Sequence, residues 1–309
     1  MEQDSSDNAE PIVELEINGD YQGVYIFLEK IKRDKNRVDV ARLEPTDSDS
    51  ASITGGYILK IDKTAGGDLH IDQPLEYFEN NWEDDARYTS DISFRSQYDI
   101  YGQLLNFEPF GEPYHPDQYL ETYFLYEYPK AEVITEAQKS YIQNYIHEFE
   151  SALLTDDFSS EQRTYTDYID LESFVDFFIL NELCRNIDGY RLSTYMYKDR
   201  GEKLKMGPVW DFNIGFFSGG RIPMDDWVIN YNLHVDRDAW MMPFWWPRLM
   251  EDPGFRLMLQ SRWNNLRSGV LSLSEMLWMV DMDAASLRNS GAVTRNYKRW
   301  DKGIGIDWE

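Results

Sequence analysis

Two aspartates have the residue type and surroundings to do chemistry: Asp188, in the stretch NIDGYRLS, and Asp211, in the stretch PVWDFN. Asp211 stands in an aromatic and aliphatic run between Trp210 and Phe212. A carboxylate buried in such a run needs a hydrogen-bonded, charged or metallic partner, because burying it unpaired is very costly. Asp211 is therefore a candidate metal ligand, with a backbone-capping carboxylate as the structural alternative.

The elements between the two aspartates predict that they share one site. A buried, central helix is predicted over 170–185, because Asp170 is a capping residue and the helix is apolar nearly all round. The stretches STYMYK and KLKM, joined by the turn DRGE, then predict a β-hairpin. A hairpin returns the chain to the end from which it departed, so Asp188 before it and Asp211 after it are expected to face one another across a small gap.

Protein kinases use such a pair of carboxylates. One Asp, on a loop after a buried helix, accepts the proton of the substrate hydroxyl, and a second Asp, after a strand pair, holds the metal ion that bridges the phosphates. A glycoside hydrolase with Asp188 and Asp211 as acid and base is an alternative, which requires a raised pKa and a suitable separation of the carboxyl groups. For Asp188, beside Gly189, a simple turn residue is the structural alternative.

The rest of the chain divides into a β-rich and a helical part. Residues 12–29 alternate around Asn18-Gly19, which predicts a hairpin, and the run GGYILKIDK predicts another strand. Residues 64–118 lack a clear period, which favours loops and short strands. Apolar residues at helical spacing predict a helix over 135–154, and the text beyond residue 240 is mostly helical. The sequence thus predicts an α+β fold, β-rich over 1–118 and mainly helical over 119–309.

Composition excludes several classes of protein. The chain has 309 residues, and 30 Lys plus Arg against 56 Asp plus Glu give a net charge of -26, which would repel nucleic acid and an anionic membrane surface. Phosphate chemistry in such a chain would depend on a divalent metal and on local cations. No apolar run approaches the roughly 20 residues that span a bilayer, so membrane insertion is not expected. Cys184, the single cysteine, excludes an intrachain disulfide.

Four stretches in order, NGDYQGVYIFLEKI, GGYILKIDK, NIDGYRLSTYMYKD and KMGPVWDFNIGF, closely resemble the spore-coat-protein-H (CotH-like) family of atypical kinases from bacteria and some fungi. The resemblance covers about residues 12–220. It implies a two-lobed kinase-like fold, ATP-dependent phosphoryl transfer to Ser or Thr of a protein substrate, and Mg²⁺, or Mn²⁺, as cofactor. It also suggests secretion or display at a bacterial cell surface, with a signal peptide absent from the sequence given.

Matched motif to motif, the resemblance places Asp188 where the family has its catalytic Asp and Asp211 where it has the metal-binding Asp. A typical kinase catalytic loop also carries an Asn, shortly after its Asp, that holds a second metal. Ser193 stands at that position here, and Asn213 is a candidate substitute. The weaker ligand Ser193 keeps open a second interpretation: a binding or structural protein of a cell-surface or extracellular assembly that retained the fold and lost the chemistry.

Nucleotide contacts are assigned to the N-terminal part. Because the chain lacks a G-x-G-x-x-G loop, the turn from Gly19 to Gly23 is the candidate to cover the phosphates. Glu29 and Lys60 are candidates for the ion pair that orients the phosphates, in reversed chain order relative to ordinary kinases, with a cross-strand surface pair as the alternative. Lys30 belongs to a basic cluster, interpreted as a solvated face or as a site for triphosphate or an acidic substrate; its members are Lys30, Lys32, Arg33, Lys35 and Arg37. The stretch WMMPFWW at 240–246 is interpreted as packing, with a stacking platform for sugars or peptides as the alternative.

Overall fold

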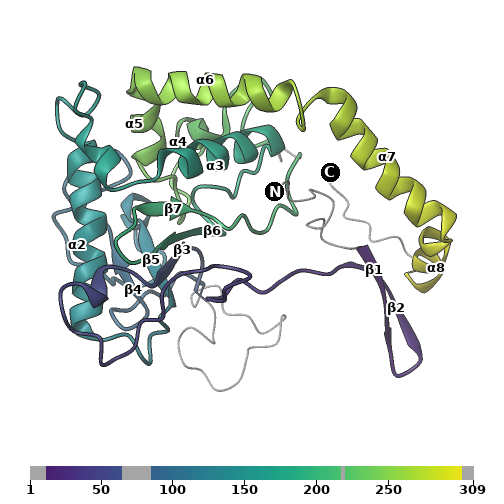
Figure 1. Ribbon diagram of the computed structural model, residues 1–309, viewed down its shortest axis with the longest axis horizontal. Helices are drawn as coiled ribbons and strands as arrows, with labels where there is room; N and C mark the ends of the chain where they lie inside the picture. The colour runs from purple at the N-terminus through teal and green to yellow at the C-terminus, as the bar shows by residue number, and fades with distance from the viewer. Residues whose placement is uncertain (1–11, 65–84, 217–219, 301–309) are drawn as a thin grey trace. The chain divides into compact units, whose positions relative to one another are not determined.

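The computed structural model describes residues 12–64, 85–216 and 220–300 (Figure 1). The chain divides into two compact units. The larger unit comprises Ile31–Arg262, and the smaller unit combines Met1–Lys30 with Trp263–Glu309. The smaller unit is thus built from both ends of the sequence.

The smaller unit contains a two-stranded antiparallel sheet, β1 (Ile12–Ile17) and β2 (Asp20–Ile26), which confirms the first predicted hairpin. Asn18 and Gly19 form the turn with positive φ angles of 51° and 83°, a conformation that the Asn-Gly pair accommodates. Helices α7 (Leu273–Asn289) and α8 (Ala292–Arg299) complete it.

Polar contacts attach β2 and its neighbours to α8. Asn296 Oδ1 accepts a hydrogen bond of 2.9 Å from the backbone N–H of Val24, and Trp300 Nε1 donates to the carbonyl of Gln22 at 3.0 Å. Arg295 forms an ion pair of 2.6 Å with Glu14 on β1. The hairpin therefore has its partner at the opposite end of the chain.

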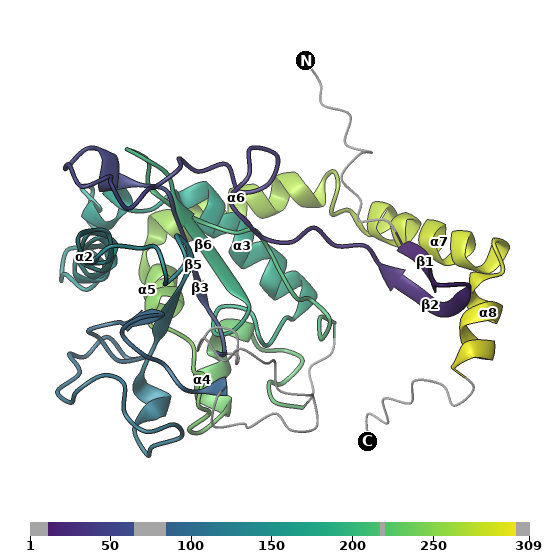
Figure 2. The same cartoon turned by 90° about the horizontal axis from the view of Figure 1, so that it is seen from below.

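A five-stranded antiparallel sheet, in the order β4-β5-β3-β6-β7, forms the centre of the larger unit. Figure 2 labels its strands β3, β5 and β6. Its strands are β3 (Tyr57–Ile61), β4 (Ser93–Arg95), β5 (Tyr123–Tyr128), β6 (Thr194–Lys198) and β7 (Leu204–Met206). Central β3 pairs with β5 on one side and with β6 on the other, with Ile61 opposite Thr194. The predicted strand around Lys60 and the predicted hairpin before Asp211 are both confirmed.

The two long predicted helices are confirmed, and each begins at a capping residue. Helix α2 (Glu136–Leu153) starts from a capping box in which Thr135 and Gln138 satisfy each other's backbone N–H groups. Helix α3 (Leu171–Cys184) starts at Asp170, whose carboxylate accepts from the backbone N–H of Ser173 at 2.9 Å. The remaining helices are α4 (Tyr231–His234), α5 (Trp245–Glu251) and α6 (Pro253–Arg267).

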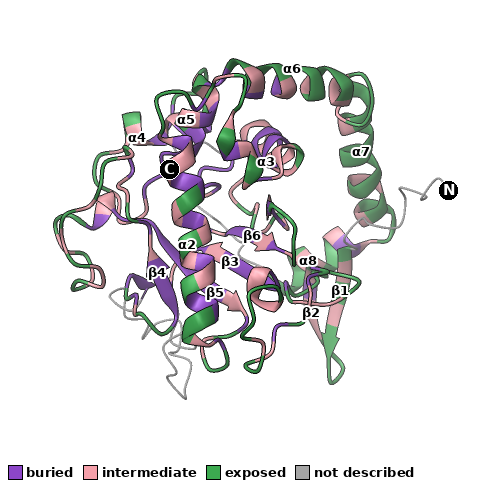
Figure 3. Ribbon diagram, turned by 60° about the vertical axis from the view of Figure 1, so that its left-hand side comes forward, coloured by how far each residue is buried: buried purple, intermediate pink, exposed green. Residues whose placement is uncertain are grey.

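Aromatic side chains fill the space between the sheet and these helices. Trp245 packs against Phe124 of β5 and Phe149 of α2, with ring centroids 5.5 and 4.9 Å apart, and Trp246 packs on Phe174 of α3 at 5.6 Å. Buried residues accordingly line the strands and the inward side of α2 (Figure 3). For this tryptophan pair the interpretation as packing is confirmed, and the stacking platform is wrong because both rings are buried.

The fold is mixed α and β, with two antiparallel sheets, as expected for the α+β class. The five-stranded sheet takes β3 and β4 from before residue 118 and its other three strands from after it. The division into lobes at 1–118 and 119–309, and the kinase-like arrangement of those lobes, stay predictions. Among the helices that the structure describes, none is long and apolar enough to cross a membrane.

Glu150 of α2 gives a prediction for pH-dependent stability. Its buried carboxyl accepts hydrogen bonds from Ser96 Oγ and Trp245 Nε1, and burial raises its pKa from 4.5 to about 8. Between those two values the unfolded chain releases a proton that the folded chain retains, so this group makes the folded state less stable as pH rises. Glu150→Gln removes the titration, so the variant should gain stability relative to the native protein between pH 5 and pH 8.

Urea unfolding of both proteins at several pH values measures this difference. Glu148→Gln, which removes an exposed carboxylate from the same helix, is the control and should run parallel to the native protein. If the stability of Glu150→Gln also ran parallel to that of the native protein across pH, Glu150 would ionise at the same pH in the folded and unfolded states.

Candidate active site

Asp211 is exposed, which corrects the expectation of a carboxylate inside a buried run. Strand β7 ends at Met206, and the backbone N–H of Gly207 makes the last sheet hydrogen bond, to Tyr195. The chain then leaves the sheet. Val209 and Phe216 are exposed as well, whereas Trp210 packs against a cluster of core residues. Apolar residue types do not by themselves ensure burial.

Asp211 shares a hydrogen-bonded site with Ser193 and with Asp62. Ser193 Oγ donates to Asp211 Oδ2 at 3.3 Å, and the backbone N–H of Ser193 donates to Asp62 Oδ1 at 3.4 Å. Asp62 directly follows β3 and Ser193 directly precedes β6. Because Ile61 and Thr194 are opposite one another in the antiparallel pair, the sheet itself brings Asp62 and Ser193 together.

The electrostatics of Asp62 favour a nearby cation. Burial raises the pKa of Asp62, and the negative charge of Asp211 raises it further, while Lys60 and backbone hydrogen bonds act in the opposite direction. A metal ion beside two neighbouring carboxylates stabilises their ionised forms. The predicted site did not include Asp62, whose only local signal is that of an Asp within the predicted strand GGYILKIDK.

Asp188 lies in the loop between α3 and β6. Its Oδ1 forms an ion pair of 2.7 Å with Arg191, and its side chain is 31% exposed, whereas that of Arg191 is 2% exposed. The backbone carbonyl of Asp188 accepts from Leu192 N–H at 2.8 Å, which closes the loop directly before Ser193. The described hydrogen bonds of Asp188 and Asp211 go to different partners, so a face-to-face arrangement of the two carboxylates stays a prediction.

Two contacts hold the segment after Asp211 against the loop that carries Asp188. The first is the hydrogen bond from Ser193, at the far end of that loop, to Asp211. The second is a backbone hydrogen bond from Phe216 N–H to the carbonyl of Cys184, the last residue of α3. Residues 211–216 are therefore tied to both ends of the loop that carries Asp188.

The backbone of this region is locally constrained. Tyr190, Ser193 and Asp211 have positive φ angles of 71°, 48° and 58°, a region that residues other than glycine rarely adopt. Such conformations cost free energy, persist only where surrounding contacts impose them, and are concentrated at functional sites.

The remaining predicted site residues are Asn213, Lys60, Glu29 and Lys30. Asn213 is exposed in the turn after Asp211. Lys60 Nζ lies 3.9 Å from Glu127 of β5, a partner that sequence analysis did not identify. Glu29 and Lys30 are exposed and belong to the smaller unit, as does the Gly19 to Gly23 turn, so the Glu29–Lys60 pair stays a prediction.

Within residues 12–64, 85–216 and 220–300, no group of three or more His, Cys, Asp or Glu side chains could hold a metal ion. The Asp62–Asp211 pair has only two carboxylates, with Ser193 as a neutral oxygen ligand. Mg²⁺ is commonly bound in this way, through one or two carboxylates, substrate phosphates and water, rather than by an all-protein cage. The site is therefore suited to a metal that arrives with a phosphate ligand.

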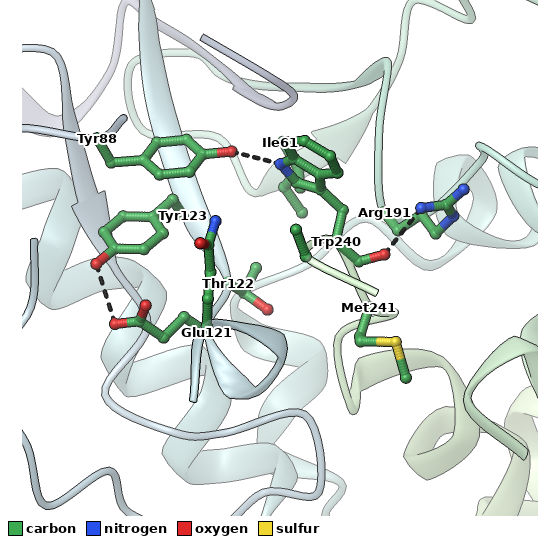
Figure 4. Close-up of a pocket in the computed structure, with 10 residues that line it drawn as sticks. Ile61, Tyr88, Glu121, Thr122, Tyr123, Arg191, Trp240 and Met241 are labelled. Carbon is green, nitrogen blue, oxygen red and sulfur yellow. Dashed lines mark hydrogen bonds between the residues drawn. The ribbon is translucent and has the colours of Figure 1, made fainter. Parts of the chain in front are cut away.

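A small pocket lies between the Asp62 and Asp188 regions and is lined by Tyr88, Trp240 and Arg191, among others (Figure 4). Trp240 Nε1 donates to Tyr88 Oη at 2.8 Å, and Tyr88 Oη donates to the carbonyl of Asp62 at 2.8 Å. The carbonyl of Trp240 accepts from Arg191 at 2.9 Å. Trp240 thus connects the two regions by hydrogen bonds.

Gly189, next to Asp188, generates a prediction. A Cβ at this position would lie 2.0 Å from Oδ1 of the buried Asn181, which is itself fixed by hydrogen bonds to Asn186 and to the carbonyl of Phe177. Gly189→Ala should therefore displace the loop and destabilise the protein by about 1–3 kcal/mol, as overpacking does. Chemical denaturation measures the loss. In an Asn181→Ala background, which removes the clashing atom, the same substitution should cost less; an equal cost in both backgrounds would exclude this clash as the cause.

The sequence matches one described protein family over nearly its whole length. A family model described as CotH kinase protein matches residues 7–304, nearly the whole chain, and so extends beyond the motifs of residues 12–220 into the helical C-terminal part. No curated protein matches the sequence significantly. On the strength of the family match, the chain belongs to the CotH kinase family.

Proposed function

We propose that this protein is an atypical ATP-dependent protein kinase that transfers the γ-phosphoryl group to Ser or Thr hydroxyls of a protein substrate. The observation that carries the proposal is the convergence of Asp62 at the end of β3, Ser193 at the start of β6 and Asp211 in the segment after β7. Ser193 also ends the loop that carries Asp188. Membership of a family named for a kinase supports it.

Asp211 and Asp62 would hold Mg²⁺ or Mn²⁺, assisted by Ser193 or Asn213. When bound with ATP, the metal would supply charge neutralisation at the phosphates. The two carboxylates fit this role because a cation would stabilise both negative charges. Burial first, and then the charge of Asp211, raise the pKa of Asp62. In a chain with a net charge of -26, an anionic nucleotide needs such a local positive charge. Lys60, Lys30 and Glu29 are proposed as further nucleotide-binding residues.

Asp188 would receive the acceptor hydroxyl. Its Oδ1 is paired with Arg191, so we assign the hydroxyl proton to Oδ2. In the transfer step, the hydroxyl oxygen forms a bond to the γ-phosphorus while the bond from that phosphorus to the β,γ-bridging oxygen breaks. The proton passes to Asp188, and the bonding electron pair leaves with ADP. Most of the rate enhancement would come from positioning and charge neutralisation.

A binding or structural protein that kept the fold and lost the chemistry is the second candidate. The observation that favours it is Ser193, a neutral and weakly coordinating side chain at the position where typical kinases hold a second metal with Asn. The two candidates differ in a measurable property, because only the kinase requires a metal-dependent nucleotide complex.

Isosteric variants of the two aspartates separate these candidates. With Mg²⁺ or Mn²⁺ present, the native protein should bind ATP or a non-hydrolysable analogue, and Asp211→Asn should weaken that binding at least about tenfold because the metal loses a charged ligand. Asp188→Asn should bind nucleotide normally and transfer phosphate roughly 10²–10⁴-fold more slowly, the range for loss of an acid–base group. Calorimetry measures binding, and radiolabelled ATP measures transfer.

Asp236→Asn is the matched control, since it removes one negative charge from a side chain that is 95% exposed, and it should leave both quantities unchanged. Absence of metal-dependent nucleotide binding by the native protein would reject the kinase in favour of the binding protein. Equal loss of binding in the Asp211 and Asp236 variants would attribute the effect to net charge rather than to the site.

A further inference from the structure

Arg191 is a buried cation whose hydrogen-bonding groups are satisfied from several directions. Its Nε donates to the carbonyl of Ile187 at 2.8 Å, its Nη1 to the carbonyl of Trp240 at 2.9 Å, and its Nη2 to Asp188 Oδ1 at 2.7 Å. The guanidinium also lies 4.3 Å from the ring centroid of Tyr231. A charge this deeply buried is tolerated only with such partners, and together they fix its position.

Asp238 is the second carboxylate near Arg191, at 3.5 Å, but it has other donors of its own. Tyr231 Oη donates to Asp238 at 2.7 Å, and Arg221 lies 3.4 Å from the same oxygen. The contact from Arg191 to Asp188 is much the shorter of its two ion pairs. Because Tyr231 and Arg221 also stabilise the charge of Asp238, the charge of Arg191 is available to stabilise Asp188, which is the more exposed carboxylate.

The support behind Arg191 reaches the other carboxylate of the site. Trp240 accepts from Arg191 through its carbonyl and donates through its indole N–H to Tyr88 (Figure 4). Tyr88 in turn donates to the carbonyl of Asp62. A single segment, Asp238 to Trp240, therefore holds Arg191 and is connected to the end of β3. These hydrogen bonds therefore fix the position of Asp188 relative to Asp62.

We propose that Arg191 is a positioning residue, which fixes the Asp188 carboxylate by binding Oδ1 and so directs Oδ2 toward the acceptor hydroxyl. The inference rests on the proposed kinase function. A guanidinium can satisfy Asp188 and the Trp240 carbonyl together through its planar fork, whereas an ammonium group is a compact point charge that reproduces this geometry poorly. Arg191 should thus govern the transfer step and leave nucleotide binding, assigned to Asp211 and Asp62, largely intact.

Three variants of the full-length chain test the role of Arg191. Arg191→Met removes the charge and the fork, and Arg191→Lys keeps the charge. Arg221→Met is the matched control, because Arg221 shares Asp238 and Tyr231 but interacts with Asp188 only through space. Each variant is first checked for native unfolding temperature, then assayed for binding of a Mg²⁺–nucleotide analogue and for transfer to dephosphorylated casein and a Ser/Thr peptide library.

We expect kcat to fall roughly 100-fold in Arg191→Met, a size typical of a misplaced reacting group, with Arg191→Lys in between. Nucleotide affinity in both, and every quantity in Arg221→Met, should stay within about threefold of native, the scale of a weak surface interaction. If Arg191→Met does not fold, Arg191→Lys alone tests the inference: its kcat should fall while its nucleotide affinity is retained.

Three results would overturn the inference. Native kcat in the Arg191 variants would show that Asp188 needs no such partner. Parallel losses of kcat and nucleotide affinity, or equal losses in Arg221→Met, would show that Arg191 only stabilises the fold. If the native protein neither binds nucleotide nor transfers phosphate, the proposed function fails, and the role of Arg191 in it fails with it.

Discussion

The antiparallel pairing of β3 with β6 is the constraint on which the rest of the site depends. It sets the residue after β3 beside the residue before β6, so that Asp62 and Ser193 are adjacent without any loop having to deliver them. Asp211 and Asp188 are then attached to this fixed point, one through the Ser193 hydroxyl and the other through the short loop that ends at Ser193. A site whose residues lie at the ends of strands is positioned more accurately than a site built on loops alone.

Local patterns were sufficient to predict the elements but not all of the site. The first hairpin, α2, α3 and the hairpin before Asp211 each carry a signal within a few residues, such as Asn18-Gly19 or the cap at Asp170. Local patterns could not predict that Asp62 belongs to the site, because its place there follows from the register between strands that are far apart in sequence. The exposure of Asp211 escaped prediction for a related reason: whether another layer covers an apolar run is a tertiary property.

Charge is organised unevenly in this acidic chain. Around Asp188 and Asp238, buried or half-buried arginines balance carboxylates, so that the ionised groups are held by fixed partners. Around Asp62 and Asp211, the carboxylates accept hydrogen bonds from the Ser193 hydroxyl and from the backbone N–H groups of Ser193 and Lys63, and the charge of Lys60 lowers the pKa of Asp62.

The construction of the smaller unit from both ends of the chain has a consequence for biosynthesis. The strands β1 and β2 leave the ribosome before the larger unit, whereas Arg295, Asn296 and Trp300, which contact them, are made after it. An isolated two-stranded hairpin is at best marginally stable in water. During translation the hairpin therefore lacks its α8 contacts until the whole larger unit has been synthesised. A chain truncated before α8 would not form these contacts at all.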